Sequence, residues 1–236
     1  MEKKILIIKN ITREGPGVIE HLLREQDIPY TIVDLDKGQA FPSPKGYAAL
    51  IVLGGPDSAN DTTEKMKIEL KRIKEAFSLN LPYIGICLGL QTLVKAAGGK
   101  VVKNPTKEIG FRGPDGTQFT VSLTDDGKKD ELFNELSDNF RVFQLHGETV
   151  ELTKNMKLLA QGKFCQNQVV KVGSNAYGIQ CHFELTPEMF NRWLEEDADL
   201  RQLKKAELQK EFLAFKNEYT ETGRTLFKNF LKIAGF

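Results

Sequence analysis

Short apolar runs alternate with amphipathic stretches through the first half of the chain, and few folds accommodate that order. Amphipathic segments separate apolar runs of strand length, which lie at residues 5–8, 31–33, 48–53 and 82–86. One of these segments carries apolar side chains along a single helical face, namely Met66, Leu70, Ile73 and Phe77. The order of strand, helix and strand predicts βαβ units. It therefore predicts an α/β fold with an open, mostly parallel central sheet flanked by helices.

The second half of the chain has a different pattern. Short apolar segments follow one another with Gly-, Asp- and Asn-rich turns between them, at residues 119–123, 141–145, 168–172 and 177–181. Because little helix separates these segments, they predict a small antiparallel extension of the same domain. From Pro187 onward the periodicity is helical again, and we expect Thr222–Gly223 to break the last helix. The acidic run from Glu195 to Asp199 is interpreted as a solvent-exposed face.

Length and charge narrow the class of protein. A chain of 236 residues fits a single domain over residues 1–236, with a helical C-terminal segment at 187–236. Lys and Arg number 33 against 32 for Asp and Glu, a balance that argues against a nucleic-acid or membrane partner. Apolar runs are too short for a membrane span or a secretory signal. With only 3 cysteines, which cannot all pair, we expect a cytoplasmic protein.

The motif Gly85-Ile86-Cys87-Leu88-Gly89 stands where the fourth apolar run meets a helical stretch. It has the form of a nucleophile elbow, in which the nucleophile occupies a strained turn between a strand and a helix. Glycines on both sides let strand and helix pack closely. The helix N-terminus favours the thiolate, which is the nucleophilic form of cysteine. On spacing alone, a catalytic cysteine and a buried structural cysteine are equally good interpretations.

Two histidines have matching surroundings in the sequence. His146-Gly147-Glu148 and His182-Phe183-Glu184 each place a glutamate two residues after a histidine at a predicted strand end. Residues i and i+2 of an extended chain point to the same side, so either glutamate could orient its histidine beside a thiolate. The residues alone do not decide which pair accompanies Cys87. We expect His21, in a helical stretch remote from any strand end, on the surface.

The glycine-rich loop Leu53-Gly54-Gly55-Pro56 follows the third apolar run. Its backbone N–H groups, with that of Leu88, are candidates for stabilising the oxyanion of an acyl transfer, although an ordinary Gly-Pro turn has the same sequence. The loop also resembles a phosphate loop of ATP pyrophosphatases, but Leu53 and Pro56 depart from that pattern and exclude it. Nucleotide-binding and metal-binding motifs are absent from the sequence, so neither kind of site is predicted.

The order of these motifs resembles the class I, triad-type glutamine amidotransferases. It is most similar to the stand-alone members related to the amidotransferase domain of GMP synthetase. The resemblance covers nearly the whole chain and rests on Ile84–Gln91, Gly178–Glu184, Leu53–Pro56, Glu108–Gly110 and Gln144–Glu148. It implies the flavodoxin-like fold of that family. The chain departs from the family at Cys181, where an aromatic residue is usual, and at Phe183, where proline is frequent, but neither change removes a catalytic group.

The resemblance assigns a role to each motif. It implies that Cys87 is the nucleophile, that His182 is the general base and acid, and that Glu184 orients His182. It implies an oxyanion hole built from the backbone N–H groups of Gly55 and Leu88. The residues it assigns to substrate binding are Gly54, Gln91, Gly110 and His146. It implies no metal and no organic cofactor.

The implied reaction is hydrolysis of the γ-amide of glutamine through a γ-glutamyl thioester, releasing glutamate and ammonia. Because no part of the sequence resembles a synthetase, we expect a separate synthetase or acceptor subunit to use the ammonia. A γ-glutamyl peptide hydrolase would use the same triad, with water as its only acceptor. A non-catalytic binding subunit is the third hypothesis, which the intact triad disfavours. The sequence leaves the homodimer question open, since an isologous interface has no sequence signature.

Overall fold

A nine-stranded sheet forms the centre of the computed structural model, which describes residues 3–236. Five neighbouring strands run parallel in the order β2-β1-β3-β4-β11. Their bounds are β1 Ile5–Lys9, β2 Tyr30–Asp34, β3 Ala49–Val52, β4 Tyr83–Ile86 and β11 Ala176–Ile179. This is the strand order of a flavodoxin-like doubly wound sheet, and the carboxyl ends of such strands are where these folds bind their ligands. The predicted fold class is confirmed.

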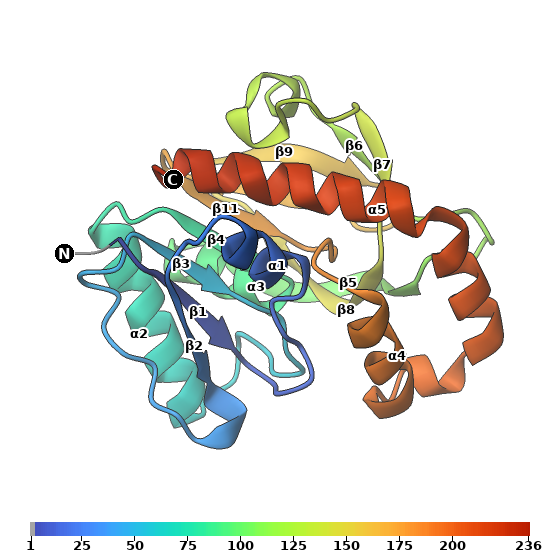
Figure 1. Ribbon diagram of the computed structural model, residues 1–236, viewed down its shortest axis with the longest axis horizontal. Coiled ribbons are helices and arrows are strands. Elements are labelled where there is room, and N and C mark those ends of the chain that lie inside the picture. The colour runs from blue at the N-terminus through green and yellow to red at the C-terminus, as the bar shows by residue number, and fades with distance from the viewer. Residues whose placement is uncertain (1–2) are drawn as a thin grey trace.

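Helices cover both faces of the parallel strands because those strands are apolar on both faces. In β1, Ile5 and Ile7 pack into one core layer and Leu6 and Ile8 into the other. Helices α1 and α5 belong to the first layer and lie side by side in front of the sheet (Figure 1), while α2 and α3 belong to the second. The helix bounds are α1 Val18–Glu25, α2 Glu64–Ser78, α3 Leu88–Ala96, α4 Pro187–Glu196 and α5 Lys205–Ile233.

The sheet continues beyond β11 with antiparallel strands in the order β10, β9, β6, β7. The expected antiparallel extension is therefore present in the same sheet, but the predicted segment 177–181 is not part of it, because it forms β11 and pairs parallel with β4. Its bounds are β6 Thr120–Leu123, β7 Asn139–Arg141, β9 Met156–Gly162 and β10 Val169–Val172. A separate two-stranded sheet pairs β5 (Lys100–Gly110) with β8 (Gln144–Glu151). Short 3₁₀ turns complete the fold: η1 Leu35–Lys37, η2 Gly127–Lys129, η3 Glu131–Phe133 and η4 Leu200–Gln202.

The last helix corrects one expectation. Helix α5 runs unbroken for 29 residues, so the predicted break at Thr222–Gly223 is wrong. A Cβ at Gly223 would lie 2.3 Å from the backbone oxygen of Phe183, so the glycine lets the helix lie directly against the segment 182–184. A glycine in a helical stretch has the same local sequence whether it breaks the helix or allows a distant segment to pack against it. The sequence around Gly223 therefore does not reveal the contact with Phe183.

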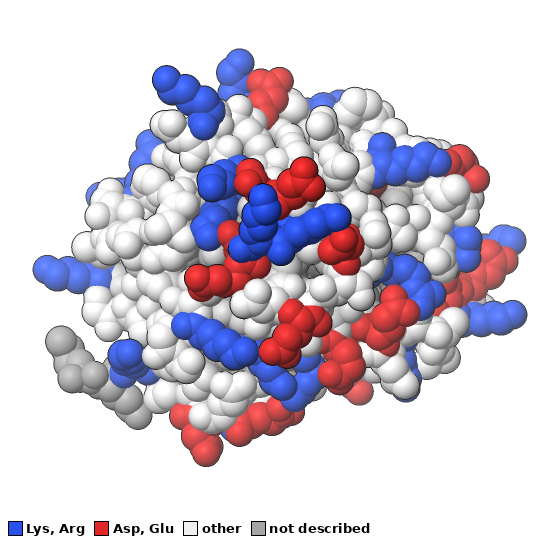
Figure 2. Space-filling view, turned by 90° about the horizontal axis from the view of Figure 1, so that it is seen from above, with Lys and Arg blue, Asp and Glu red and all other residues white. Residues whose placement is uncertain are grey.

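Charged side chains of both signs are mixed on the face shown in Figure 2, in keeping with the near-equal counts of 33 basic and 32 acidic residues. Across residues 3–236, no helix is long and apolar enough to cross a membrane.

Candidate active site

Cys87 occupies a strained turn between β4 and α3, with φ 52° and ψ −104°. A left-handed φ is unfavourable for a side-chain-bearing residue and persists only where the surroundings impose it. The flanking glycines do so by close packing. A Cβ at Gly85 would lie 2.3 Å from the backbone oxygen of Gly89, and a Cβ at Gly89 would lie 2.2 Å from that of Val52. The prediction that Gly85 and Gly89 allow close packing at this turn is confirmed.

His182 follows β11 and is fixed from several directions. Its backbone N–H donates to the carbonyl of Phe143 (2.9 Å), and its own carbonyl accepts from the Tyr219 hydroxyl (2.8 Å). The ring of Trp193, on α4, packs edge-on against the imidazole with centroids 5.1 Å apart. Helices α4 and α5 therefore act as a scaffold for one histidine.

Glu184 approaches the imidazole of His182 as the spacing of the two residues predicts. Its Oε1 lies 2.7 Å from His182 Nδ1, and its Oε2 accepts the backbone N–H of Phe183 at 3.0 Å. Burial alone would lower the pKa of His182. The negative charge of Glu184 and hydrogen bonds with Cys87 and Glu184 outweigh that effect and hold the pKa well above its usual range. The imidazole therefore readily holds a proton that a neighbouring thiol gives up.

His146 has a different environment, although its motif has the same spacing. It lies inside β8 rather than at a strand end, which corrects that expectation. Its Nδ1–H donates to the backbone carbonyl of Glu148 (2.9 Å), and its Nε2 lies 2.7 Å from Glu108 Oε2 in a buried contact that is poorly aligned for a hydrogen bond. The Glu148 carboxylate accepts from the Ser58 hydroxyl instead (3.0 Å). Because Nδ1 bonds to the Glu148 carbonyl and Nε2 lies against Glu108, His146 directs neither ring nitrogen at Cys87.

Two glutamine side chains connect the β8 side of the site to the sulfur. Gln91 Nε2 lies 3.3 Å from both the carbonyl of Glu148 and Oε1 of Gln180. Gln180 Nε2 in turn donates to Cys87 Sγ at 3.6 Å. No sequence motif singles out Gln180 for a role of its own. Its position two residues before His182 in a strand-end segment is the signal that could have suggested one, because i and i−2 share a side.

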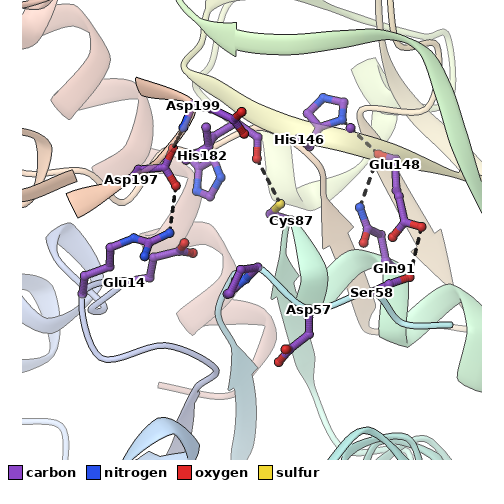
Figure 3. A pocket seen from close by; sticks show the side chains of 15 residues that line it. Glu14, Asp57, Ser58, Cys87, Gln91, His146, Glu148, His182, Asp197 and Asp199 are labelled. Atoms are coloured by element: carbon purple, nitrogen blue, oxygen red, sulfur yellow. Dashed lines mark hydrogen bonds and ion pairs between the residues drawn. The ribbon is translucent and has the colours of Figure 1, made fainter. Parts of the chain in front are cut away.

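A cavity of about 300 Å³ opens over these residues, at the lower end of the range typical for small-molecule sites. Among the predicted site residues it is lined by Cys87, His182, Gly55, Gln91 and His146. Glu184 lies behind His182. Figure 3 shows Cys87 at the centre, with His182 on one side and Gln91, His146 and Glu148 on the other.

Three further predicted residues are not part of the lining of this cavity, and two of them, Gly54 and Leu88, adjoin Cys87. A Cβ at Gly54 would lie 3.4 Å from His182 Cε1 and 3.5 Å from Cys87 Cβ, so this glycine is beside the reacting pair. Leu88 follows Cys87 directly. Gly110 ends β5 with φ 83° and packs against Leu208, and its role as a substrate contact stays a prediction.

The backbone N–H groups of Gly55 and Leu88 are the predicted oxyanion donors. Within residues 3–236, neither donates a hydrogen bond to the protein, so both are available to a ligand. The loop that carries Gly55 is tightly held. A Cβ at Gly55 would lie 2.7 Å from Asn10 Cβ, and Asn10 Nδ2 donates to the Leu53 carbonyl at 3.1 Å. Two fixed donors beside a nucleophile are the arrangement that stabilises a tetrahedral oxyanion.

Acidic side chains dominate the charge of the cavity. Its carboxylates are Glu14, Asp57, Glu148, Asp197 and Asp199. Asp197 is only 8% exposed and pairs with Arg13 at 2.8 Å, so the interpretation of residues 195–199 as a solvent-exposed face is wrong at this position. The acidic run predicts exposure because it does not show that Asp197 pairs with Arg13, which lies far away in the chain.

Glu108, His146 and Cys165 bring one ligand atom each to within 4.8 Å of one another, a cluster that no sequence motif announced. The donor set fits a metal poorly. Glu108 and His146 already contact each other at 2.7 Å, and burial raises the pKa of the Cys165 thiol to about 11, which opposes the thiolate that a metal requires.

Comparison with known proteins agrees with this geometry. The pattern of the family "Glutamine amidotransferase class-I" matches residues 17–198. The glutamine amidotransferase-like protein YfeJ of Salmonella typhimurium is 32% identical over 157 residues, which are 64% of this chain and 63% of YfeJ. The glutamine-hydrolysing GMP synthase of Borreliella burgdorferi is 32% identical over 141 residues, which are 59% of this chain and 25% of that protein. The chain thus matches less than two thirds of the length of either relative.

Solved structures extend the likeness over the whole chain. A glutamine amidotransferase from Thermotoga maritima superposes with a TM-score of 0.85 at 25% identity, covering 98% of this chain and 99% of that one. A glutamine amidotransferase from Methylobacillus flagellatus has the same fold, with a TM-score of 0.85 at 23% identity over 99% of this chain and 95% of that one. The chain belongs to the class I glutamine amidotransferase family.

Proposed function

We propose that this protein hydrolyses the γ-amide of glutamine through a covalent γ-glutamyl thioester on Cys87. One observation carries the proposal: Glu184 holds His182 by Nδ1 at 2.7 Å, which leaves Nε2 to exchange a proton with Cys87. Family membership and the glutamine-hydrolysing activity of the related GMP synthases support the same substrate.

In the first half of the reaction, the Cys87 thiol gives its proton to His182 Nε2 and the sulfur attacks the γ-carbonyl carbon. The backbone N–H groups of Gly55 and Leu88 stabilise the oxyanion. The imidazolium of His182 then protonates the amide nitrogen, the carbon–nitrogen bond breaks, and ammonia leaves. The enzyme is left as a thioester and His182 as a neutral imidazole.

In the second half, His182 takes a proton from water and the resulting hydroxide attacks the thioester. The carbon–sulfur bond breaks, His182 returns the proton to the sulfur, and glutamate is released. Glu184 keeps the imidazole in the tautomer that both halves require and stabilises its charged form. Gln91 and His146 line the cavity on the side away from His182, where the glutamyl part of the substrate would bind.

We further propose that residues 1–236 act as one domain. This proposal is supported by a sheet that runs without interruption from β2 to β7 and by α5, which packs against both α1 and η3.

The acceptor of the ammonia is proposed to be a separate synthetase subunit.

The test is glutamate release from free glutamine by the full chain, with Cys87→Ala and Cys87→Ser as matched variants. Glutamate release that both variants abolish, together with a 5-fold or greater burst of ammonia over glutamate in the first turnover, supports the thioester route. Glutamate release that survives in Cys87→Ala would overturn it. Release from γ-glutamylglycine but not from glutamine would identify a γ-glutamyl peptide hydrolase instead.

A further inference from the structure

Glu14 lies in a loop that follows β1 and is held against the active-site segment. The next residues are Gly15-Pro16-Gly17, and the backbone N–H of Val18 donates to the carbonyl of Glu184 at 2.9 Å. Gly17 has φ 47°, and a Cβ there would lie 2.0 Å from the same carbonyl oxygen, so only glycine permits this contact. The loop therefore places Glu14 at a fixed position relative to His182 and Glu184.

The Glu14 carboxylate is directed at the reacting pair. The side chain lines the cavity, although the residue is only 5% exposed. A Cβ built at Gly54 serves as a common reference position. It would lie 2.3 Å from Glu14 Oε2, 3.4 Å from His182 Cε1 and 3.5 Å from Cys87 Cβ. Figure 3 shows Glu14 on the His182 side of Cys87, opposite Gln91 and Glu148.

This carboxylate differs from the other acids of the cavity because it lacks a partner. Asp57, Asp197 and Asp199 pair with Lys65, Arg13 and Lys107, respectively. Glu148 accepts a hydrogen bond from Ser58. Within residues 3–236, the Glu14 carboxylate makes neither a hydrogen bond nor an ion pair. Its oxygens face the cavity instead of being sealed in the protein, so this carboxylate is available to a group that binds beside Cys87.

Burial gives this group a titration near neutrality. It raises the pKa of Glu14 to about 7, an effect that the charges of His182 and Arg13 oppose and those of Glu184 and Asp197 reinforce. Glu14 can therefore either hold a proton or carry a negative charge at neutral pH.

We propose that Glu14 binds the nitrogen leaving group of the reaction and selects against leaving groups that carry a negative charge. This inference rests on the proposed function, because the leaving nitrogen must lie next to His182, which protonates it. Ammonia leaves the thioester as a neutral molecule. It accepts the proton of the Glu14 carboxyl, so one O–H bond breaks, one N–H bond forms, and an ammonium–carboxylate pair results. An amine that carries an additional positive charge is attracted instead by the ionised form of the Glu14 carboxylate.

The negative charge of ionised Glu14 disfavours γ-glutamyl peptides. Cleavage of a peptide such as γ-glutamylglycine would bring the carboxylate of the leaving amino acid next to Glu14, and like charges in a partly desolvated site repel strongly. The site therefore accepts γ-glutamyl amides in the order cationic, neutral and anionic leaving group.

The test compares three substrates that differ mainly in the charge of the leaving amine: γ-glutamyl-ethylenediamine, γ-glutamyl-ethylamide and γ-glutamylglycine. The wild-type full chain is expected to show kcat/KM at least 10-fold higher for the cationic than for the anionic substrate. Glu14→Gln, which keeps the shape and removes the charge, is expected to reduce that ratio to within 2-fold. Asp57→Asn is the control, because it removes a charge from the same cavity and should preserve the order.

The pH dependence provides a second readout. The cationic-to-anionic ratio of the wild type is expected to rise between pH 6 and pH 8 as Glu14 loses its proton, and to stay flat in Glu14→Gln. The order of the three substrates remaining unchanged in Glu14→Gln would overturn the proposal. An equal rise of KM for all three would show instead that Glu14 binds the α-ammonium of the glutamyl part.

Binding to Cys87→Ala by calorimetry separates this inference from the proposed function. If the wild type cleaves neither glutamine nor any of the three substrates, the proposed function fails. The charge preference is then still decided by the affinities of the three compounds for Cys87→Ala and for the same protein with Glu14→Gln. A preference that is the same in both proteins would refute the role of Glu14.

Discussion

His182 Nδ1 and Glu184 Oε1 are 2.7 Å apart, and the second oxygen of the carboxylate is held by the backbone N–H of Phe183. The carboxylate therefore reaches its histidine in a fixed orientation. His146 and Glu148 have the same spacing, but His146 bonds to the backbone carbonyl of Glu148 and not to its carboxylate. Identical spacing in the sequence thus produces two different contacts.

This difference predicts different effects of the same substitution. Glu184→Gln keeps the size of the side chain but removes the charge that stabilises the imidazolium, and its amide can turn a donor toward Nδ1. We expect kcat for glutamine hydrolysis to fall by about 10²- to 10⁴-fold. Glu148→Gln retains the backbone carbonyl that His146 uses, and we expect less than about a 10-fold loss. Steady-state kinetics at saturating glutamine compares the two variants. Equal losses would contradict the assignment of His182 and Glu184.

Glu69 predicts a pH dependence of stability. This side chain of α2 is fully buried, accepts one hydrogen bond from Asn10 Nδ2 at 3.3 Å, and has its pKa raised by burial from 4.5 to about 7. Between those two values the folded state binds more protons than the unfolded state. The free energy of unfolding therefore falls as pH rises through this window and levels off above it.

We expect Glu69→Gln to gain up to about 3 kcal/mol of stability over the wild type between pH 5 and pH 8. Urea unfolding at the two pH values measures the change. Part of the slope should persist in the variant, because Glu14 is also buried with a pKa raised to about 7. Glu64→Gln is the control, since this side chain is exposed on the same helix and should keep the slope of the wild type. A slope unchanged in Glu69→Gln would refute the prediction.

The parts of the fold and site that were predicted correctly rest on local sequence. The parallel strands are continuous apolar runs, the Cys87 turn lies within five residues, and Glu184 is two residues from His182. Each of these features depends on contacts between near neighbours, which the periodicity of strand and helix determines. Local patterns therefore carried the fold class and the His182–Glu184 contact, whereas the assignment of this pair to Cys87 came from the resemblance of the ordered motifs and stays a prediction.

The features that the sequence did not reveal depend on contacts between distant segments. Strand β5 has a run of charged and polar residues and becomes a strand only because β8 pairs with it. Asp197 is buried only because Arg13, 184 residues earlier, pairs with it. Gln180 donates to Cys87 from the segment after β11, and Glu14 lines the same cavity from the loop after β1. The periodicity of a single segment does not predict contacts between segments that are distant in the chain.

Gly223 predicts the effect of adding one methyl group between two such segments. In an unhindered helix interior, Gly→Ala stabilises by about 1 kcal/mol. Here the new Cβ would lie 2.3 Å from the backbone oxygen of Phe183, so either α5 or the segment 182–184 must shift. We expect Gly223→Ala to destabilise the protein by about 1–3 kcal/mol and to lower kcat.

The neighbouring substitution Thr222→Ala is the control, because the Thr222 hydroxyl bonds only to the Glu218 carbonyl of its own helix. It should change the free energy of unfolding by less than about 0.7 kcal/mol. Thermal unfolding and glutamine hydrolysis measured on both variants give the comparison. Stabilisation by Gly223→Ala would show that α5 does not lie against Phe183 as described.

Gln180 predicts a change in the reactivity of the sulfur that does not require substrate. Its amide donates to Cys87 Sγ at 3.6 Å, and its carbonyl oxygen lies 3.3 Å from Gln91 Nε2. Gln180→Leu preserves the volume and the backbone hydrogen bond to Gln168 but removes the donor, so a negative charge on the sulfur loses stabilisation. We expect the rate of alkylation of Cys87 by iodoacetamide at pH 7 to fall by about 10- to 100-fold, corresponding to the loss of one hydrogen bond to a charged group. Mass spectrometry distinguishes Cys87 from the buried Cys165 and Cys181. An unchanged rate in Gln180→Leu, with the fold intact by circular dichroism, would mean that the amide contributes nothing to the reactive sulfur.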